Sequence, residues 1–152
     1  MKTSSRSSDS DLDHLLAALK SAPSVNTLEI WMYCTSPNLN SFNSDEKSGK
    51  WCIFREEGEI DDVWQAISTL VENEELLLAK CSTKLSQRLG PPRPYPYVIC
   101  VYTQDWADDA ELDRTLQVIR AAGIEGILKY KRCIETFAGI EGDFEFYRTS
   151  SP

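Results

Sequence analysis

Apolar residues change their spacing along this chain, and this change constrains the fold more than any other feature of the sequence. From Asp61, they recur every three or four residues: Val63, Trp64, Ile67, Leu70 and Val71. The same spacing returns from about Asp108 to Ala122, where it joins Leu112, Leu116 and Ile119. This period predicts two amphipathic helices that bury these residues and carry acidic side chains in their first turns.

Between the helices, short segments rich in large and β-branched side chains predict strands. The five expected strands are Leu28–Cys34, Trp51–Phe54, Leu76–Ser82, Tyr97–Thr103 and Ile127–Ile134. The order is strand, strand, helix, strand, strand, helix, strand, with connections short enough for hairpins. We therefore expect an α+β fold, in which a mainly antiparallel sheet carries the helices on one face.

One domain accounts for most of the 152 residues. Residues 1–10 are rich in serine and predict a disordered tail, residues 11–148 the domain, and residues 149–152 a second tail. Leucines at helical spacing from Asp11 to Lys20 predict a short helix, and Thr83–Pro96 reads as a long loop. No apolar run approaches the roughly 20 residues that cross a membrane, so we expect no membrane partner.

Charge is unevenly distributed. The net charge is −8, which argues against a protein that coats nucleic acid through a broadly basic surface. The segment from Lys80 to Gln104 nevertheless contains Lys80, Lys84, Arg88 and Arg93 and no acidic residue. Any anion site must therefore be local.

Strand alternation places several polar groups together. Lys50 shares a face with Cys52, Lys80 with Ser82, and Tyr102 with Cys100, because side chains two residues apart point the same way. We expect Lys50, Lys80 and Tyr102 on the helix-free face, where Arg93 from the long loop or Arg132 from the last strand completes an anion site. The alternative is that the lysines only extend into solvent from a half-exposed sheet.

The residues that bind metals or cofactors are scarce. The five cysteines show no CxxC spacing and lie mostly in apolar runs, so we expect free, mostly buried thiols in a reducing compartment, the cytoplasm or the nucleus. His14 is the one histidine. We expect no metal and no cofactor.

Four tryptophans raise the question of base stacking. We expect Trp31, Trp51 and Trp64 in the core, and Trp106, just after a strand, as the most accessible ring. A paired tryptophan sandwich with an adjacent acid, as cap recognition requires, is only half present at Asp105 and Trp106. RNA is therefore the weaker candidate partner.

Four ordered blocks carry a family resemblance. They are Gly49-Lys50-Trp51, Asp62-Val63-Trp64, Ala79-Lys80-Cys81-Ser82-Thr83, and the run from Val98 to Trp106. Together they resemble the basophilic leukaemia-expressed protein family over about residues 28–140. The resemblance implies a fold similar to that of the cap-binding translation initiation factor, a curved antiparallel sheet backed by helices.

The chain also resembles, more distantly, the bacterial effector phosphothreonine lyases. That resemblance implies Lys80 as the catalytic base, Lys50 and Tyr102 as further site residues, and Arg93 as a phosphate ligand. Cys52 stands where those lyases have a histidine acid, which implies weak or absent elimination.

Three functions thus remain open from the sequence. The basic face binds a phosphorylated peptide or nucleotide, or the chain is a lyase-like enzyme, or it is a cap-binding or protein-interaction module.

Overall fold

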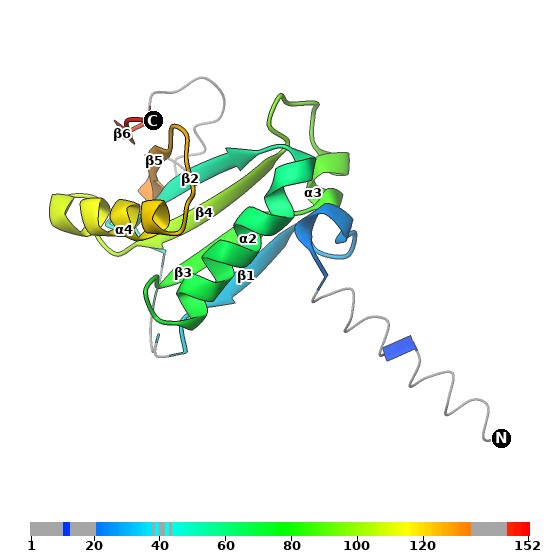
Figure 1. The fold of residues 1–152 in the computed structure, drawn as a ribbon, viewed down its shortest axis with the longest axis horizontal. Coiled ribbons are helices and arrows are strands. Elements are labelled where there is room, and N and C mark those ends of the chain that lie inside the picture. Colours follow the sequence, from blue (N-terminus) through cyan, green and yellow to red (C-terminus); the bar gives the residue numbers. More distant parts are fainter. Residues whose placement is uncertain (1–10, 13–20, 38, 40–41, 43, 135–145) are drawn as a thin grey trace.

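A six-stranded antiparallel sheet is the centre of the protein (Figure 1). The computed structural model describes residues 11–12, 21–37, 39, 42, 44–134 and 146–152. The strands are β1 (Trp31–Thr35), β2 (Gly49–Arg55), β3 (Leu78–Ser82), β4 (Tyr97–Thr103), β5 (Lys129–Arg132) and β6 (Arg148–Thr149). They lie in the order β1-β3-β4-β2-β5-β6, and each neighbouring pair is antiparallel.

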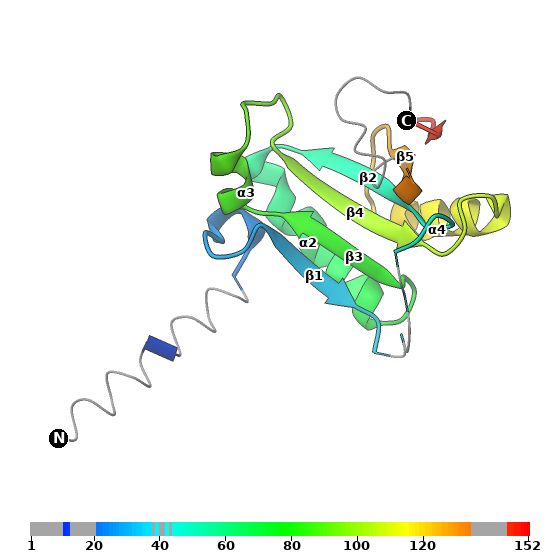
Figure 2. The same cartoon turned by 180° about the vertical axis from the view of Figure 1, so that it is seen from behind.

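Two long helices cover one face of this sheet. They are α2 (Glu57–Glu72) and α4 (Asp109–Ala121), both in front of the strands in Figure 1 and behind them in Figure 2. The 3₁₀ helix η1 (Pro23–Val25) and the short α3 (Lys84–Leu89) lie together at one end of the sheet. The expected α+β fold, with its curved antiparallel sheet and helices on one face, is confirmed.

The helical spacing in the sequence corresponds to the buried side of α2. Ile60, Trp64, Ile67 and Val71 are buried, and Val63 and Leu70 are partly buried against the same core. The helix begins four residues before the expected Asp61, and Glu57 and Glu59 occupy its first turn. Carboxylates are favourable there because they face the positive end of the helix dipole.

Some boundaries differ from those expected. The expected loop Thr83–Pro96 contains α3, because the Thr83 hydroxyl accepts a hydrogen bond from the Ser86 N–H and so starts a helical turn. The last long strand is shorter than expected and spans Lys129–Arg132. Thr149, which was expected in the tail, lies in β6 and pairs with Lys129 of β5. Residues 1–10 and 13–20, which include His14 and most of the expected first helix, lie outside the described residues.

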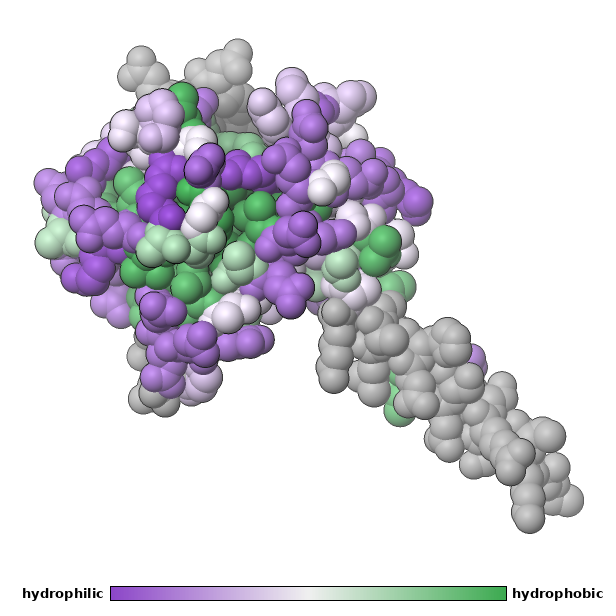
Figure 3. All heavy atoms as spheres, in the orientation of Figure 1, coloured by the Kyte–Doolittle hydropathy of each residue, from purple (hydrophilic) through white to green (hydrophobic). Residues whose placement is uncertain are grey.

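The core joins the sheet to α4 through Trp51. Its indole N–H donates to the Leu112 carbonyl over 3.1 Å, and its ring packs edge-on against Tyr130 at 5.3 Å. Hydrophilic side chains cover much of the helix side of the molecule, and apolar side chains are visible between them (Figure 3). Among the described helices, none has the length and apolar character needed to cross a membrane.

Gly49 sits under the ring of Tyr130. A Cβ atom at Gly49 would lie 1.9 Å from the Tyr130 hydroxyl oxygen, which is itself 2.6 Å from the Thr103 hydroxyl. Tyr130 is fully buried, so its ring has little room to move. The glycine is needed here for close approach.

Gly49→Ala should therefore destabilise the protein by about 1 to 3 kcal/mol, because the added methyl overpacks the core. The measurement is the free energy of unfolding from urea titration. Gly58→Ala is the matched control, since nothing lies within 4 Å of the added methyl in α2 and stability should stay equal or rise. Equal stabilities for Gly49→Ala and the wild type would contradict this packing.

Candidate ligand-binding face

The face of the sheet opposite α2 and α4 is basic. We call the side chains that β1 to β5 direct to this side the basic face, which is turned to the viewer in Figure 2. Its charged residues are Lys50, Lys80, Lys129 and Lys131. None of the residues that β1 to β5 direct to this face is acidic. The lysines therefore gather on one side of a chain whose net charge is −8.

The strand register fixes how these side chains are arranged. One row across five strands consists of Tyr33, Lys80, Cys100, Cys52 and Lys129, each directly opposite the next. A second row places Lys50 between its partners Tyr102 and Lys131. Directly opposite side chains on antiparallel strands have Cβ atoms about 4.5 to 5.5 Å apart, so the rows form one continuous surface.

Lys50, Lys80 and Tyr102 meet as the alternation predicts. The Lys50 Nζ lies 5.7 Å from the centre of the Tyr102 ring and the Lys80 Nζ lies 5.9 Å from it. Lys50 is buried, with 7% of its surface exposed, and Lys80 is half-buried. Within the described part of the chain, neither ammonium group makes an ion pair or a hydrogen bond.

Burial shifts the pKa of Lys80 and that of Tyr102. The pKa of Lys80 is lowered, first by burial and also by the nearby charge of Lys50. The pKa of Tyr102 is raised, chiefly by burial, so its phenol keeps its proton at neutral pH and can donate a hydrogen bond. Two ammonium groups thus lie beside the Tyr102 ring, and such a pair of cations suits an oxyanion such as phosphate.

Two thiols lie between the lysines. Cys52 and Cys100 are directly opposite on β2 and β4, and each is 4% exposed. The coupling between the two thiols lowers the pKa of Cys100 and raises that of Cys52, and the charges of Lys50, Lys80 and Lys131 also lower the pKa of Cys100. The raised pKa makes the Cys52 thiol a poor proton donor.

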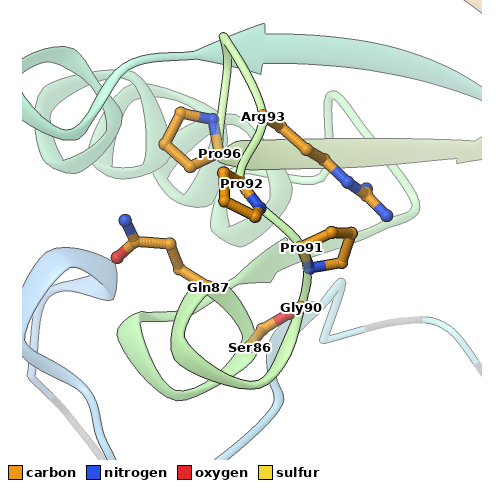
Figure 4. A pocket seen from close by; sticks show the side chains of 7 residues that line it. All are labelled: Ser86, Gln87, Gly90, Pro91, Pro92, Arg93 and Pro96. Atoms are coloured by element: carbon orange, nitrogen blue, oxygen red, sulfur yellow. The ribbon is translucent and has the colours of Figure 1, made fainter.

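Arg93 lies at the far end of the same face. It lines a broad groove of about 1170 Å³ with Phe54, Val98 and Lys129 of this face, and Glu59 and Glu125 also line the groove. Figure 4 shows Arg93 in the loop after α3, where it also borders a smaller cavity of about 320 Å³ and points away from Gln87.

Arg132 and Trp106 lie elsewhere. The register puts Arg132 on the helix side of β5, next to Tyr130, and not on the basic face. Its guanidinium group lies 4.8 Å from the Trp106 ring centre and 5.1 Å from that of Tyr147. Arg132 is therefore not directed to the basic face, and Lys131 is the neighbouring β5 residue that is.

Trp31 is a residue that the sequence reasoning assigned to the core. It is instead on the basic face, where the Lys80 Nζ lies 4.0 Å from the centre of its ring. Strand alternation could have indicated this position. Met32, the next residue in β1, is buried against the helices, so Trp31 faces the opposite side. Among the described residues, no group of three His, Cys, Asp or Glu side chains could hold a metal ion.

Structural comparison shows which fold this is. The chain resembles Caenorhabditis elegans eIF4E-3, solved with the 4E-binding protein Mextli and a cap analog, with 15% identity, a TM-score of 0.57, and coverage of 79% of this chain and 68% of that one. Ascaris suum eIF4E-3 with m2,2,7G cap gives 13% identity and a TM-score of 0.55 over 90% of this chain and 79% of that one.

A third structure, a schistosome eIF4E complexed with m7GpppA and 4E-BP, has 13% identity and a TM-score of 0.53. The match covers 76% of this chain and 65% of that one. The fold is thus that of the eIF4E proteins. The model of the family described as basophilic leukemia-expressed protein Bles03 matches residues 43–132, which hold β2 to β5 and both long helices. This match covers more than half of the sequence, and the chain belongs to the Bles03 family.

Proposed function

We propose that the basic face binds a phosphorylated ligand through Lys50 and Lys80. The observation that carries this proposal is the pair of ammonium groups, one buried and one half-buried, without a carboxylate partner in the described part of the chain. Removing an ammonium group from water is unfavourable unless an opposite charge or hydrogen bonds replace the lost hydration. A bound phosphate would supply both.

Geometry supports a phosphate more than a carboxylate. Lys50 and Lys80 approach the Tyr102 ring from two directions, and the phenol of Tyr102 keeps its proton. A phosphate has three terminal oxygens, enough to accept from both ammonium groups and from a hydroxyl together. Arg93 and Lys129 beside the groove would contact a longer ligand further along the strands.

The ligand is a nucleotide or a phosphopeptide. The neighbouring eIF4E structures contain a cap analog, m7GpppA or a modified cap, so a sheet of this shape can hold a phosphorylated nucleotide. Trp31 and the exposed Tyr33 offer rings on the basic face for a base. The groove lined by Phe54 and Val98 would instead suit the side chains of a peptide.

Lyase-like elimination is the second candidate. A lowered pKa suits Lys80 for the role of base. The Cys52 thiol is held by Cys100 and its pKa is raised, so the leaving phosphate lacks an efficient proton donor. We propose binding without efficient turnover, in a reducing compartment such as the cytoplasm, where the five free thiols persist.

Lys80→Met should weaken binding of the tighter of two probes, a phosphothreonine peptide or a cap analog, by roughly 10- to 100-fold, because one charged hydrogen bond is lost. Isothermal titration calorimetry measures the affinity. Lys84→Met is the matched control, since Lys84 pairs with Glu57 away from the basic face, and it should bind like the wild type. If neither probe binds, or if both variants bind equally, the proposal is wrong.

The same samples test catalysis. We expect the phosphothreonine peptide to keep its mass after incubation with the wild type. A product with a dehydrated threonine would instead establish elimination, and Cys52→His should then increase its yield because imidazole is a better acid at neutral pH.

Lys80→Met should also raise the unfolding temperature. The pKa of Lys80 is lowered in the folded state, so the unfolded chain binds more protons in the window between that pKa and the ordinary value of 10.5. At a pH below this window, the charge of Lys80 destabilises the folded state. This destabilisation disappears as the pH rises through the window. Thermal unfolding at increasing pH should therefore show the advantage of Lys80→Met shrinking. A lower unfolding temperature for the variant at neutral pH would indicate a structural role for the lysine.

A further inference from the structure

We propose that Cys52 and Cys100 are a redox-active pair that a hydroperoxide oxidises to a disulfide between β2 and β4. The first support is their position. They are directly opposite in the register of two neighbouring strands. Such residues have Cα atoms about 4.5 or 5.5 Å apart, and both separations lie within the range of about 4.4 to 6.8 Å that a disulfide spans.

The second support is the charge around the pair. Lys80 is directly opposite Cys100, and Lys50 and Lys131 lie in the adjoining row. The nucleophilic form of cysteine is the thiolate, which nearby cations favour. Lys80 is directly opposite Cys100 and the pKa of Cys100 is the lowered one, so we assign Cys100 as the attacking sulfur and Cys52 as the thiol that resolves it.

The other cysteines lack this combination. Cys81 is fully buried on the helix side, and burial raises its pKa. Cys34 is more exposed than the pair, but burial and Glu72 raise its pKa and its S–H donates to the Ser68 carbonyl. Cys133 packs in the same apolar cluster as the pair. It is not the register partner of either cysteine, because Cys52 and Cys100 are opposite each other in β2 and β4.

The chemistry balances with one hydroperoxide. The Cys100 thiolate attacks one peroxide oxygen, the oxygen–oxygen bond breaks, and the released hydroxide takes a proton to become water. Cys52 then attacks the sulfur of the resulting sulfenic acid, the sulfur–sulfur bond forms, and the proton of Cys52 leaves with the hydroxide as a second water. The two cysteines are oxidised and the peroxide is reduced. Because each thiol is only 4% exposed, a small oxidant such as hydrogen peroxide is required.

Oxidation would also change the basic face. The lysines favour the thiolate form of Cys100, and oxidation to the disulfide removes the negative charge that this form carries. An anion at Lys50 and Lys80 would then bind more tightly. This consequence rests on the proposed function, whereas the disulfide itself does not.

The test uses the full chain without ligand, treated with one equivalent of hydrogen peroxide and then digested without reductant. Mass spectrometry should find the peptides of Cys52 and Cys100 joined, with the loss of two hydrogen atoms, and denatured protein should titrate three thiols instead of five. A thiol reductant should restore all five.

Cys133→Ser is the matched control, because it removes a thiol of the same cluster and should still form the disulfide. Cys52→Ser should leave Cys100 as a sulfenic acid that a dimedone probe traps. The proposal is overturned if wild-type Cys34 is oxidised while the pair stays reduced, or if Cys100 proceeds to sulfinic acid with Cys52 intact. These readouts come from the wild type as well as the variants, so a variant that fails to fold does not decide the result.

Discussion

The register between β2 and β4 is the constraint on which the rest of the structure depends. These central strands pair along seven residues each, from Gly49 opposite Thr103 to Arg55 opposite Tyr97. The pairing directs Trp51 and Ile53 to the helices and directs Lys50 and Cys52 to the opposite side. A slip of one residue would exchange the two faces and bury lysines under α2 and α4, which the apolar core does not permit.

The two faces of this sheet differ in the side chains that they carry and in their effect on stability. On the helix side, apolar residues and Tyr130 fill the core, and Gly49 makes room for the tyrosine ring. On the basic face, the strands hold lysines close together without an acidic residue among them, which costs stability. A surface that keeps an unfavourable charge arrangement is typical of a binding site.

The sequence predicted features that depend on period and not those that depend on individual contacts. The β4 bounds, the buried phase of α2 and the shared face of Lys50, Lys80 and Tyr102 followed from spacing. The helix α3 arose from one hydroxyl cap in a segment rich in proline. The position of Arg132 could not be predicted from spacing, because β5 carries cations on both of its sides. Only the pairing of β5 with β2 shows which side faces the helices.

The most direct test of the central claim is an NMR titration that locates the bound ligand, with signals assigned for backbone amides and lysine side chains. The tighter of the phosphopeptide and the cap analog is added to the reduced protein. The largest shifts should fall on Lys50, Lys80 and Tyr102 and should decline towards the helix side. Shifts confined to α2 and α4, or no shifts at all, would contradict it.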